Sequence, residues 1–217
     1  MRKKFLPQHN LKTILMLLGI SIFFLVLFYV FTFVVKSERL NSFDFDMTVR
    51  LSDKIPRKFD PYFSFLSLTG SFEIVGGILL LLLFIRRKIL GILVLGVFLF
   101  AHVIEFLGKS IMHHPPPPFM FFRYDLGFQF PTSYVQTGNS YPSGHAMRMV
   151  FLLVIASWII LKFKLKVEAK WILLAGVFVY SILMLISRVV LGEHWTTDVI
   201  GGSIIGASFG IFSLIFL

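Results

Sequence analysis

Long apolar runs dominate this sequence and decide which folds it can adopt. Each run is close to the roughly 20 residues that an α-helix needs to cross the hydrocarbon core of a bilayer. The hydrophobic share of 57% exceeds that of ordinary soluble domains, so the sequence predicts an all-α, polytopic membrane protein with six transmembrane helices. The fourth and fifth runs are short for a span, so tilted or buried helices stay open as alternatives there. The runs occupy residues 13–35, 66–85, 89–108, 146–161, 171–186 and 199–217.

The placement of basic residues predicts the orientation of these spans. If the N-terminus is cytosolic, eleven basic residues and one acidic residue, Glu168, fall on the cytosolic side. The opposite side then has ten basic and ten acidic residues, so the cytosolic side holds the whole formal net charge of +10. Cytosolic loops of membrane proteins carry such an excess. We therefore expect a multi-pass plasma-membrane protein with both termini in the cytosol and no nucleic-acid partner. The eleven are Arg2, Lys3, Lys4, Lys12, Arg86, Arg87, Lys88, Lys162, Lys164, Lys166 and Lys170.

The start of the chain resembles a signal peptide in its charge but not in its length. The apolar run that follows is too long, and no small-residue cleavage site follows it. We expect a retained span and a single membrane-embedded domain over residues 1–217, without internal repeats. The chain has no cysteine, so disulfides and thiolate metal ligands are excluded.

In this layout three segments face the side opposite the cytosol, at residues 36–65, 109–144 and 187–198. The first mixes charged and aromatic residues, which is typical of a connector helix that lies on a membrane surface. The second and third hold nearly all the residue types that can do chemistry. We therefore expect the active site at the extracytoplasmic face.

The third segment, SRVVLGEHWTTD (187–198), contains an imidazole and a carboxylate four residues apart. On a helix, His194 and Asp198 share a face. A carboxylate that accepts the Nδ1 proton leaves Nε2 unprotonated, and a histidine held in this way is a base or a nucleophile. A helix cap beside an incidental histidine explains the same pair, but His145, Arg188 and Lys109 on the same side favour catalysis.

The stretch YPSGHAM (141–147) puts a proline, a small hydroxyl and a glycine where an apolar helix begins. Free backbone N–H groups at such a helix start bind anions, and Gly144 lets an anion approach closely. A bound anion favours the protonated form of His145, which can then donate a proton to a leaving oxygen. The stretch therefore predicts a phosphate cradle with an acid beside it.

Lys109, PSGH at 142–145 and SRVVLGEHWTTD at 187–198 together resemble the three-part signature of the type 2 phosphatidic acid phosphatase superfamily, also called lipid phosphate phosphatases. The order of the motifs and the six-span layout fit this resemblance. It implies that His194 takes the phosphoryl group as a phosphohistidine, that Asp198 orients His194, and that His145 protonates the departing group. It also implies catalysis without a metal or another cofactor, in which cations neutralise the phosphoryl group. The family's phosphate-binding positions correspond to Lys109, Ser143, Gly144 and Arg188.

The expected substrate is a lipid phosphate or an isoprenyl pyrophosphate whose tail stays in the bilayer. Undecaprenyl pyrophosphate, phosphatidic acid and phosphatidylglycerol phosphate all fit. A catalytically impaired relative that binds anionic lipid headgroups is the alternative. A transporter would predict internal repeats or broken helices, and the spans argue against the soluble vanadium haloperoxidases of the same superfamily.

The first motif departs from the family pattern, in which a lysine is followed after six residues by Arg-Pro. Here Pro116 and Pro117 occupy those two positions, so a phosphate-binding guanidinium is missing or comes from elsewhere. Arg148 lies three residues after His145 and shares its helix face, and an arginine just inside a span tends to face a polar cavity. Arg123, in the loop between the motifs, is the other candidate.

Several further polar residues invite a functional reading. His113 and His114 are adjacent, so their side chains point apart, and no carboxylate pair accompanies them. We therefore predict no metal site there. Ionisable groups inside spans are costly, and near the outer ends we favour structural hydrogen bonds over catalysis for Glu73, His102 and Glu105.

Overall fold

The computed structural model describes residues 9–86, 91–131 and 138–217, and this part of the chain contains helices and no β-strand. The prediction of an all-α protein is confirmed. Single 3-10 turns lie at Arg57–Phe59, Phe119–Phe121 and Leu214–Phe216. The α-helices are α1 (Leu11–Lys36), α2 (Asn41–Lys54), α3 (Asp60–Thr69), α4 (Phe72–Arg86), α5 (Gly91–Ile111), α6 (Gly144–Lys162), α7 (Val167–Val190) and α8 (Thr196–Ser213).

Within the described ranges, five helices are long and apolar enough to cross a membrane, and a bent helix pair makes a sixth candidate span. The five are α1, α5, α6, α7 and α8 with its terminal turn. The bent pair corrects the straight span expected at residues 66–85, because that run starts inside α3 and continues in α4 after a change of direction of 50°. The helix ends at Thr69, and Gly70 and Ser71 form the break.

The fourth and fifth apolar runs belong to helices that are longer than the runs themselves. α6 has 19 residues and α7 has 24, so both have the length of a span. Polar residues at their ends continue the helix, which a count of apolar residues does not register. Residues 89–90 of the third run, basic residues 2–4, 87 and 88, and residues 132–137 of the second extracytoplasmic segment lie outside the described residues.

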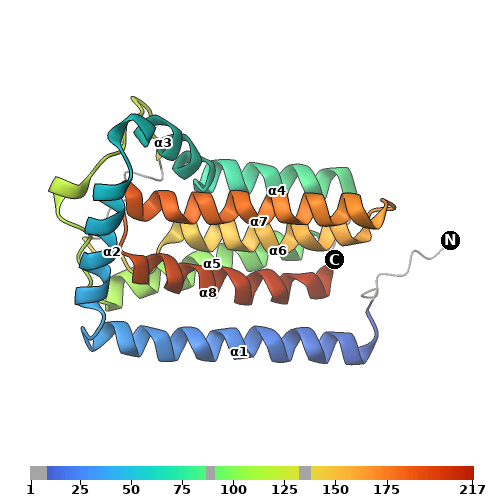
Figure 1. Ribbon diagram of the computed structural model, residues 1–217. Coiled ribbons are helices and arrows are strands. Elements are labelled where there is room, and N and C mark those ends of the chain that lie inside the picture. Colours follow the sequence, from blue (N-terminus) through green and yellow to red (C-terminus); the bar gives the residue numbers. More distant parts are fainter. Residues whose placement is uncertain (1–8, 87–90, 132–137) are drawn as a thin grey trace.

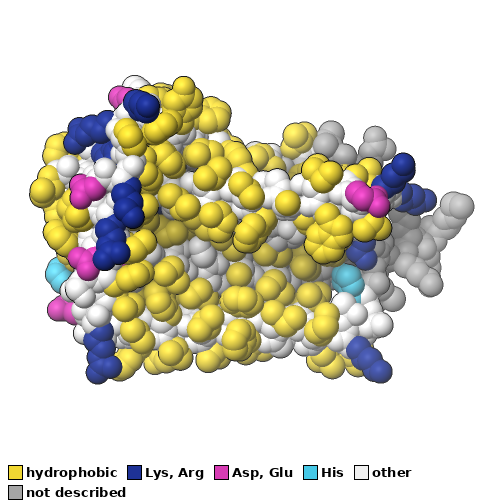
Figure 2. All heavy atoms as spheres, in the orientation of Figure 1, with side chains coloured by type: hydrophobic (Ala, Val, Ile, Leu, Met, Phe, Trp, Pro, Cys, Tyr) yellow, Lys and Arg dark blue, Asp and Glu magenta, His cyan; other side chains and the backbone are white. Residues whose placement is uncertain are grey.

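The long helices run side by side, and α2 crosses one end of the bundle (Figure 1). The start of α1 and the end of α8 lie at the opposite end. On the face drawn in Figure 2, hydrophobic side chains cover the flank, and charged side chains gather near the two ends. Exposed apolar residues on the outer helices include Phe23, Phe33, Leu81, Phe100 and Ile172. Such a belt matches the hydrocarbon core of a bilayer.

Helices α6 and α8 pack closely against each other along three glycines spaced four residues apart, Gly202, Gly206 and Gly210. A Cβ at Gly202 would lie 2.2 Å from the carbonyl oxygen of Ser143, and one at Gly206 would lie 2.3 Å from that of Met147. Glycines at this spacing allow two helix backbones to approach closely. The pairing brings the first turns of α6 and α8 together, which is where the two histidine motifs lie.

The expected surface helix of the first extracytoplasmic segment is α2, and it is fixed to the start of α8. Oδ1 of Asp44 accepts from the backbone N–H of Thr197 at 2.8 Å, and Oδ2 accepts from its hydroxyl at 2.6 Å. A carboxylate is stabilised near the N-terminal end of a helix. Burial raises the pKa of Asp44, although the hydrogen bonds from Thr197 act in the opposite direction.

Candidate active site

The turn between α7 and α8 places His194 beside Arg188. Gly192 has φ of +64°, a left-handed conformation that glycine adopts without strain. A side chain there would also collide with the carbonyl of Phe121, 2.2 Å from an added Cβ. The backbone N–H groups of Glu193 and His194 then both donate to the carbonyl of Arg188, each at 3.1 Å. The turn therefore fixes His194 relative to the last turn of α7.

His194 and Asp198 make the contact that their spacing predicts. Nδ1 of His194 donates to Oδ2 of Asp198 at 3.2 Å, and the same oxygen accepts from the backbone N–H of Trp195 at 2.9 Å. Asp198 thus caps α8 and orients the imidazole at once. Because a carboxylate only accepts, this contact keeps the proton on Nδ1 and leaves the lone pair on Nε2.

The environment of His194 favours the neutral imidazole. Burial lowers the pKa of His194 to about 4, the hydrogen bond to Asp198 opposes this, and the charge of Arg188 lowers it further. The ring is therefore uncharged at neutral pH, with Nε2 available to attack an electrophile.

The start of α6 lies against the start of α8. Ser143 caps α6, since its hydroxyl accepts from the backbone N–H of Ala146 at 3.4 Å. Its own N–H donates to the carbonyl of Asp198 at 3.0 Å. The preceding Tyr141 is fully buried, and its hydroxyl lies 2.8 Å from that of Thr32 in α1. The stretch is thus held by two helices, and the N–H groups of the first turn of α6 have no partner within their own helix.

His145 lies on the first turn of α6, close enough to His194 for the charges of the two imidazoles to interact. One terminal nitrogen of Arg148 lies 3.1 Å from Nδ1 of His145. A guanidinium can only donate, so Nδ1 is the acceptor and the ring proton is on Nε2. His145 is therefore neutral in this arrangement.

Arg148 is held at the bend between α3 and α4. Its Nε donates to the carbonyl of Gly70 at 2.8 Å, and a terminal nitrogen lies 3.4 Å from Nε2 of His102. Nδ1 of His102 lies 2.8 Å from the carbonyl of Phe98, so Nδ1 is the donor and Nε2 accepts from Arg148. The broken helix thus supplies a carbonyl that fixes this arginine.

Glu105 links Arg148 to Lys109. Its Oε1 lies 2.9 Å from Nζ of Lys109, and its Oε2 lies 3.7 Å from a terminal nitrogen of Arg148. It also packs directly on the start of α6, since a Cβ at Gly144 would lie 2.0 Å from Oε1. The carboxylate therefore holds two cations beside the predicted phosphate cradle. These contacts match the structural role expected for His102 and Glu105, and the charge of Glu73 also acts on Arg148.

Arg188 brings a third cation from the end of α7. A terminal nitrogen donates to Oε2 of Glu193 at 2.5 Å and to the hydroxyl of Ser67. Its Nε is buried and has no hydrogen-bond partner among the described residues. A buried donor without a partner is uncommon and calls for an acceptor such as a phosphate oxygen.

Arg123 does not join this group, contrary to one of the two sequence expectations. Its guanidinium donates to both carboxylate oxygens of Asp60, at 3.1 and 2.5 Å, and to the carbonyls of Ser52 and Ile55. All three guanidinium nitrogens are used by the α2–α3 connection. Arg123 therefore clamps that connection, whereas Arg148, the other candidate, lies beside His145.

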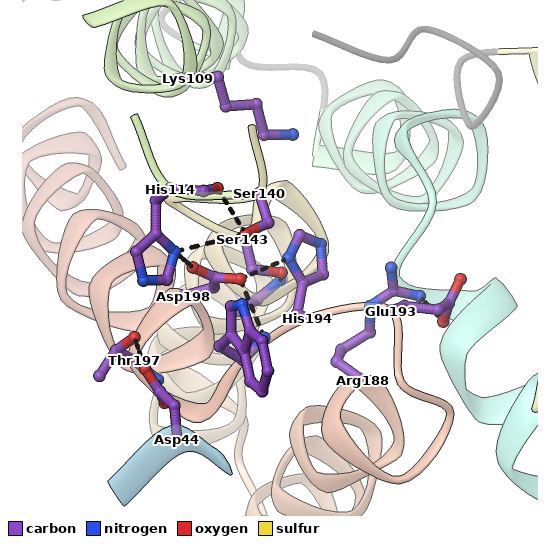
Figure 3. A network of polar contacts seen from close by, with 12 residues as sticks. Asp44, Lys109, His114, Ser140, Ser143, Arg188, Glu193, His194, Thr197 and Asp198 are labelled. Atoms are coloured by element: carbon purple, nitrogen blue, oxygen red, sulfur yellow. Dashed lines mark hydrogen bonds and ion pairs between the residues drawn. The ribbon is translucent and has the colours of Figure 1, made fainter. Parts of the chain in front are cut away.

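His114 is the residue that the sequence reasoning missed. Its Nδ1 lies 3.0 Å from Oδ1 of Asp198, on the side of the carboxylate away from His194 (Figure 3). Its neighbour His113 is exposed. In the residues that the structure describes, no three His, Cys, Asp or Glu side chains are grouped to hold a metal ion.

A family model matches the C-terminal part of this chain, and a relative matches a similar length of it. The PAP2 superfamily model matches residues 87–217. An undecaprenyl-diphosphatase from Sulfolobus acidocaldarius is 33% identical over 131 residues, which are 59% of this chain and 55% of that protein. The chain thus matches little more than half of this relative.

Two solved structures share the fold. One is a transmembrane PAP2 type phosphatidylglycerolphosphate phosphatase from Bacillus subtilis, with a TM-score of 0.71, 20% identity, and coverage of 90% of this chain and 93% of that one. The other is LpxE from Aquifex aeolicus, with a TM-score of 0.57, 24% identity, and coverage of 78% and 93%. The resemblance to a membrane phosphatase family, stated from three motifs, is confirmed.

Proposed function

The chain belongs to the PAP2 superfamily, and from this premise we propose that it hydrolyses a lipid phosphate or an isoprenyl diphosphate through a phosphohistidine. The strongest support is the buried pair of His194 and Asp198. This pair lies close to the start of α6, which carries the imidazole of His145. Three cations, Lys109, Arg148 and Arg188, surround the same place. Phosphoryl transfer needs this combination of a positioned nucleophile and fixed positive charge.

In the first step, Nε2 of His194 attacks the phosphorus and the bond from phosphorus to the leaving oxygen breaks. His145 gives a proton to that oxygen, so a lipid alcohol or a lipid monophosphate departs. Asp198 stabilises the positive charge that develops on the imidazole of His194. Hydrogen bonds from the first turn of α6 and from the three cations hold the phosphoryl oxygens.

In the second step, water attacks the phosphohistidine. His145, now neutral, accepts a proton from this water, the bond between phosphorus and nitrogen breaks, and inorganic phosphate leaves. His194 returns to its starting state with the proton on Nδ1. No metal ion takes part in this scheme.

Arg148 links the binding of substrate to the protonation of His145, the proposed general acid. In the structure it donates to Nδ1 of His145 at 3.1 Å, which is incompatible with a proton on that nitrogen. A bound phosphate competes with His145 for the guanidinium of Arg148. When the guanidinium turns to the phosphate, Nδ1 of His145 can take up a proton. His145 then becomes an acid only when substrate is present.

The same layout supports a lipid substrate and an orientation in the membrane. The site lies at one end of the bundle, beside the exposed apolar flank that the bilayer covers (Figures 1 and 2). A lipid tail can stay in the bilayer while its phosphate reaches the site. The positive-inside pattern favours the extracytoplasmic face for this end. The similarity to an undecaprenyl-diphosphatase makes an isoprenyl diphosphate the first substrate to test.

Phosphate release from a panel of lipids in detergent tests the proposal. Undecaprenyl diphosphate, phosphatidic acid and phosphatidylglycerol phosphate are compared, each with and without a chelator. We expect release from at least one lipid, at the same rate in chelator. Protection by orthovanadate without release from any lipid would instead indicate a headgroup-binding relative.

Replacing Arg148 with Ala is expected to lower kcat/KM by about tenfold to a hundredfold, the usual cost of losing hydrogen bonds from a charged group. Arg123→Ala is the matched control, because it removes a buried guanidinium of the same size. That change leaves Asp60 unpaired, so it should cost about 3 kcal/mol of stability and leave kcat/KM per folded molecule nearly unchanged. Kinetics and thermal unfolding in detergent measure both, and equal kinetic effects would contradict the assignment of Arg148.

The acid limb of the kcat/KM profile should reflect His194. The neutral imidazole is the nucleophile, so kcat/KM falls as pH drops through the His194 pKa of about 4. Above that pH this group no longer limits the rate. The phosphate groups of the substrates also titrate, so the profiles of two substrates with different phosphate pKa values are compared. An acid limb at the same pH in both profiles belongs to the enzyme. A shared limb near the ordinary imidazole pKa of about 6.5 would contradict the buried, neutral His194.

A further inference from the structure

The carboxylate of Asp198 is shared between two imidazoles from different parts of the chain. Oδ2 accepts from Nδ1 of His194 at 3.2 Å, and Oδ1 lies 3.0 Å from Nδ1 of His114. Asp198 has no exposed surface, and Oδ1 has no aligned hydrogen-bond donor among the described residues. The contact with His114 is therefore an ion pair held by charge and proximity. A buried carboxylate oxygen is costly without such a partner.

The backbone around His114 is fixed in place. Its carbonyl accepts from the backbone N–H of Ser140 at 2.8 Å and from the hydroxyl of Ser140 at 3.1 Å. Its N–H lies 3.2 Å from the side-chain oxygen of Asn139. The next residue, Pro115, accepts from the indole N–H of Trp195 at 2.8 Å. The loop that carries His114 is thus tied to both histidine motifs.

The groups around the His114 ring favour its charged form. Asp198 approaches it from α8, Asp44 lies near it on α2, and the ring of Tyr141 packs edge-on with its centre 6.0 Å away. The hydroxyl of Ser140 lies 3.4 Å from Nδ1. Burial lowers the pKa of His114, but the two carboxylates outweigh it, so the pKa is raised above its ordinary value.

We propose that His114 is a positioning residue, whose imidazolium holds Oδ1 of Asp198 so that Oδ2 stays on Nδ1 of His194. This rests on the proposed function, because it assigns a role within that reaction. His114 does not touch the phosphoryl group in this account. It acts through the carboxylate, and it adds a positive charge to the segment in which proline replaces the arginine of the family motif.

His114→Gln, compared with His113→Gln, tests the proposal in the full-length protein in detergent. At neutral pH, His114→Gln should lower kcat by about tenfold to a hundredfold, the effect of losing a charged contact, with KM within about twofold. The exposed His113 provides the same substitution one residue away, and it should leave both constants as in wild type. If the Gln variant does not fold, His114→Asn gives the same comparison.

The pH dependence of kcat shows whether His114 acts through its positive charge or only through packing. The imidazolium is present below its pKa and is lost as pH rises, so the wild-type advantage over His114→Gln should shrink and vanish at alkaline pH. His145 contributes its own alkaline limb to every variant, so the readout is the ratio of kcat values for the two Gln variants. The same deficit at every pH, a change in KM alone, or no deficit would each overturn the role of His114. No phosphate release from wild type would overturn the proposed function instead.

Discussion

Replacing His194 with Ala is expected to reduce kcat by a factor of about 10⁵, the scale seen when a catalytic nucleophile is removed. The side chain provides the atom that bonds to phosphorus. The second imidazole on Asp198, that of His114, lies against the other carboxylate oxygen. The measurement is phosphate release from the best lipid substrate over hours. His113→Ala removes an exposed imidazole nearby and should turn over at the wild-type rate.

The fold should survive the His194 substitution, because Asp198 still caps α8 through the N–H of Trp195 at 2.9 Å. Binding of orthovanadate or of unreacted lipid by the variant checks that the cations remain in place. Turnover within tenfold of wild type would mean that another group attacks the phosphorus.

Replacing His145 with Asn is expected to lower kcat by about 10²–10⁴, the usual contribution of a general acid. The loss should depend on the leaving group. A lipid alcohol needs the proton most, whereas p-nitrophenolate leaves readily without one. Because the slow second step lowers kcat for both substrates, the dependence on the leaving group is read in kcat/KM, which covers the steps up to the phosphohistidine. In the variant, kcat/KM should fall much more for phosphatidic acid than for p-nitrophenyl phosphate, and phosphate release at low substrate concentration measures it.

Asn keeps a polar group opposite Arg148, so the arginine retains a partner near its present position. An equal loss of kcat/KM on both substrates would assign His145 to binding, and an unchanged kcat/KM on both would assign it to the second step alone. Wild-type activity toward phosphatidic acid would remove His145 from the mechanism.

The membrane architecture can be predicted from the sequence because the bilayer sets the length and composition of a span. The runs in α1, α5 and α8 are long enough to be recognised without a structure, whereas the runs in α6 and α7 are short because polar residues continue both helices. The break at Gly70 and Ser71 was missed, because apolar composition does not record the direction of a helix. That break matters to the site, since the carbonyl of Gly70 holds Arg148.

The local pairs of the candidate site can also be predicted. His194 and Asp198 are four residues apart, and His145 and Arg148 are three apart, so helical periodicity alone brings each pair together. The structure gives contacts of 3.2 and 3.1 Å for these two pairs.

Contacts between distant segments could not be predicted. Nothing near Arg123 in the sequence indicates that it pairs with Asp60 in the α2–α3 connection. His113 is exposed and His114 is buried against Asp198, as expected for adjacent side chains that point apart, but their adjacency in the sequence suggests only a shared metal as a function. Which of the two faces Asp198 depends on how the loop after α5 packs against α8, and local spacing does not contain that information.

Trapping the reaction intermediate tests the central claim most directly. Enzyme is mixed with substrate labelled at the transferred phosphorus, quenched in alkali within the first turnover, digested and mapped by mass spectrometry. The proposed reaction predicts an acid-labile, alkali-stable phosphoryl group on His194, absent from His194→Ala. With p-nitrophenyl phosphate it should accumulate in His145→Asn, which lacks the base for the second step. Two results would contradict the assignment of His194 as the nucleophile. One is a phosphoryl group on another residue, and the other is turnover with no trapped phosphoryl group in wild type or in His145→Asn.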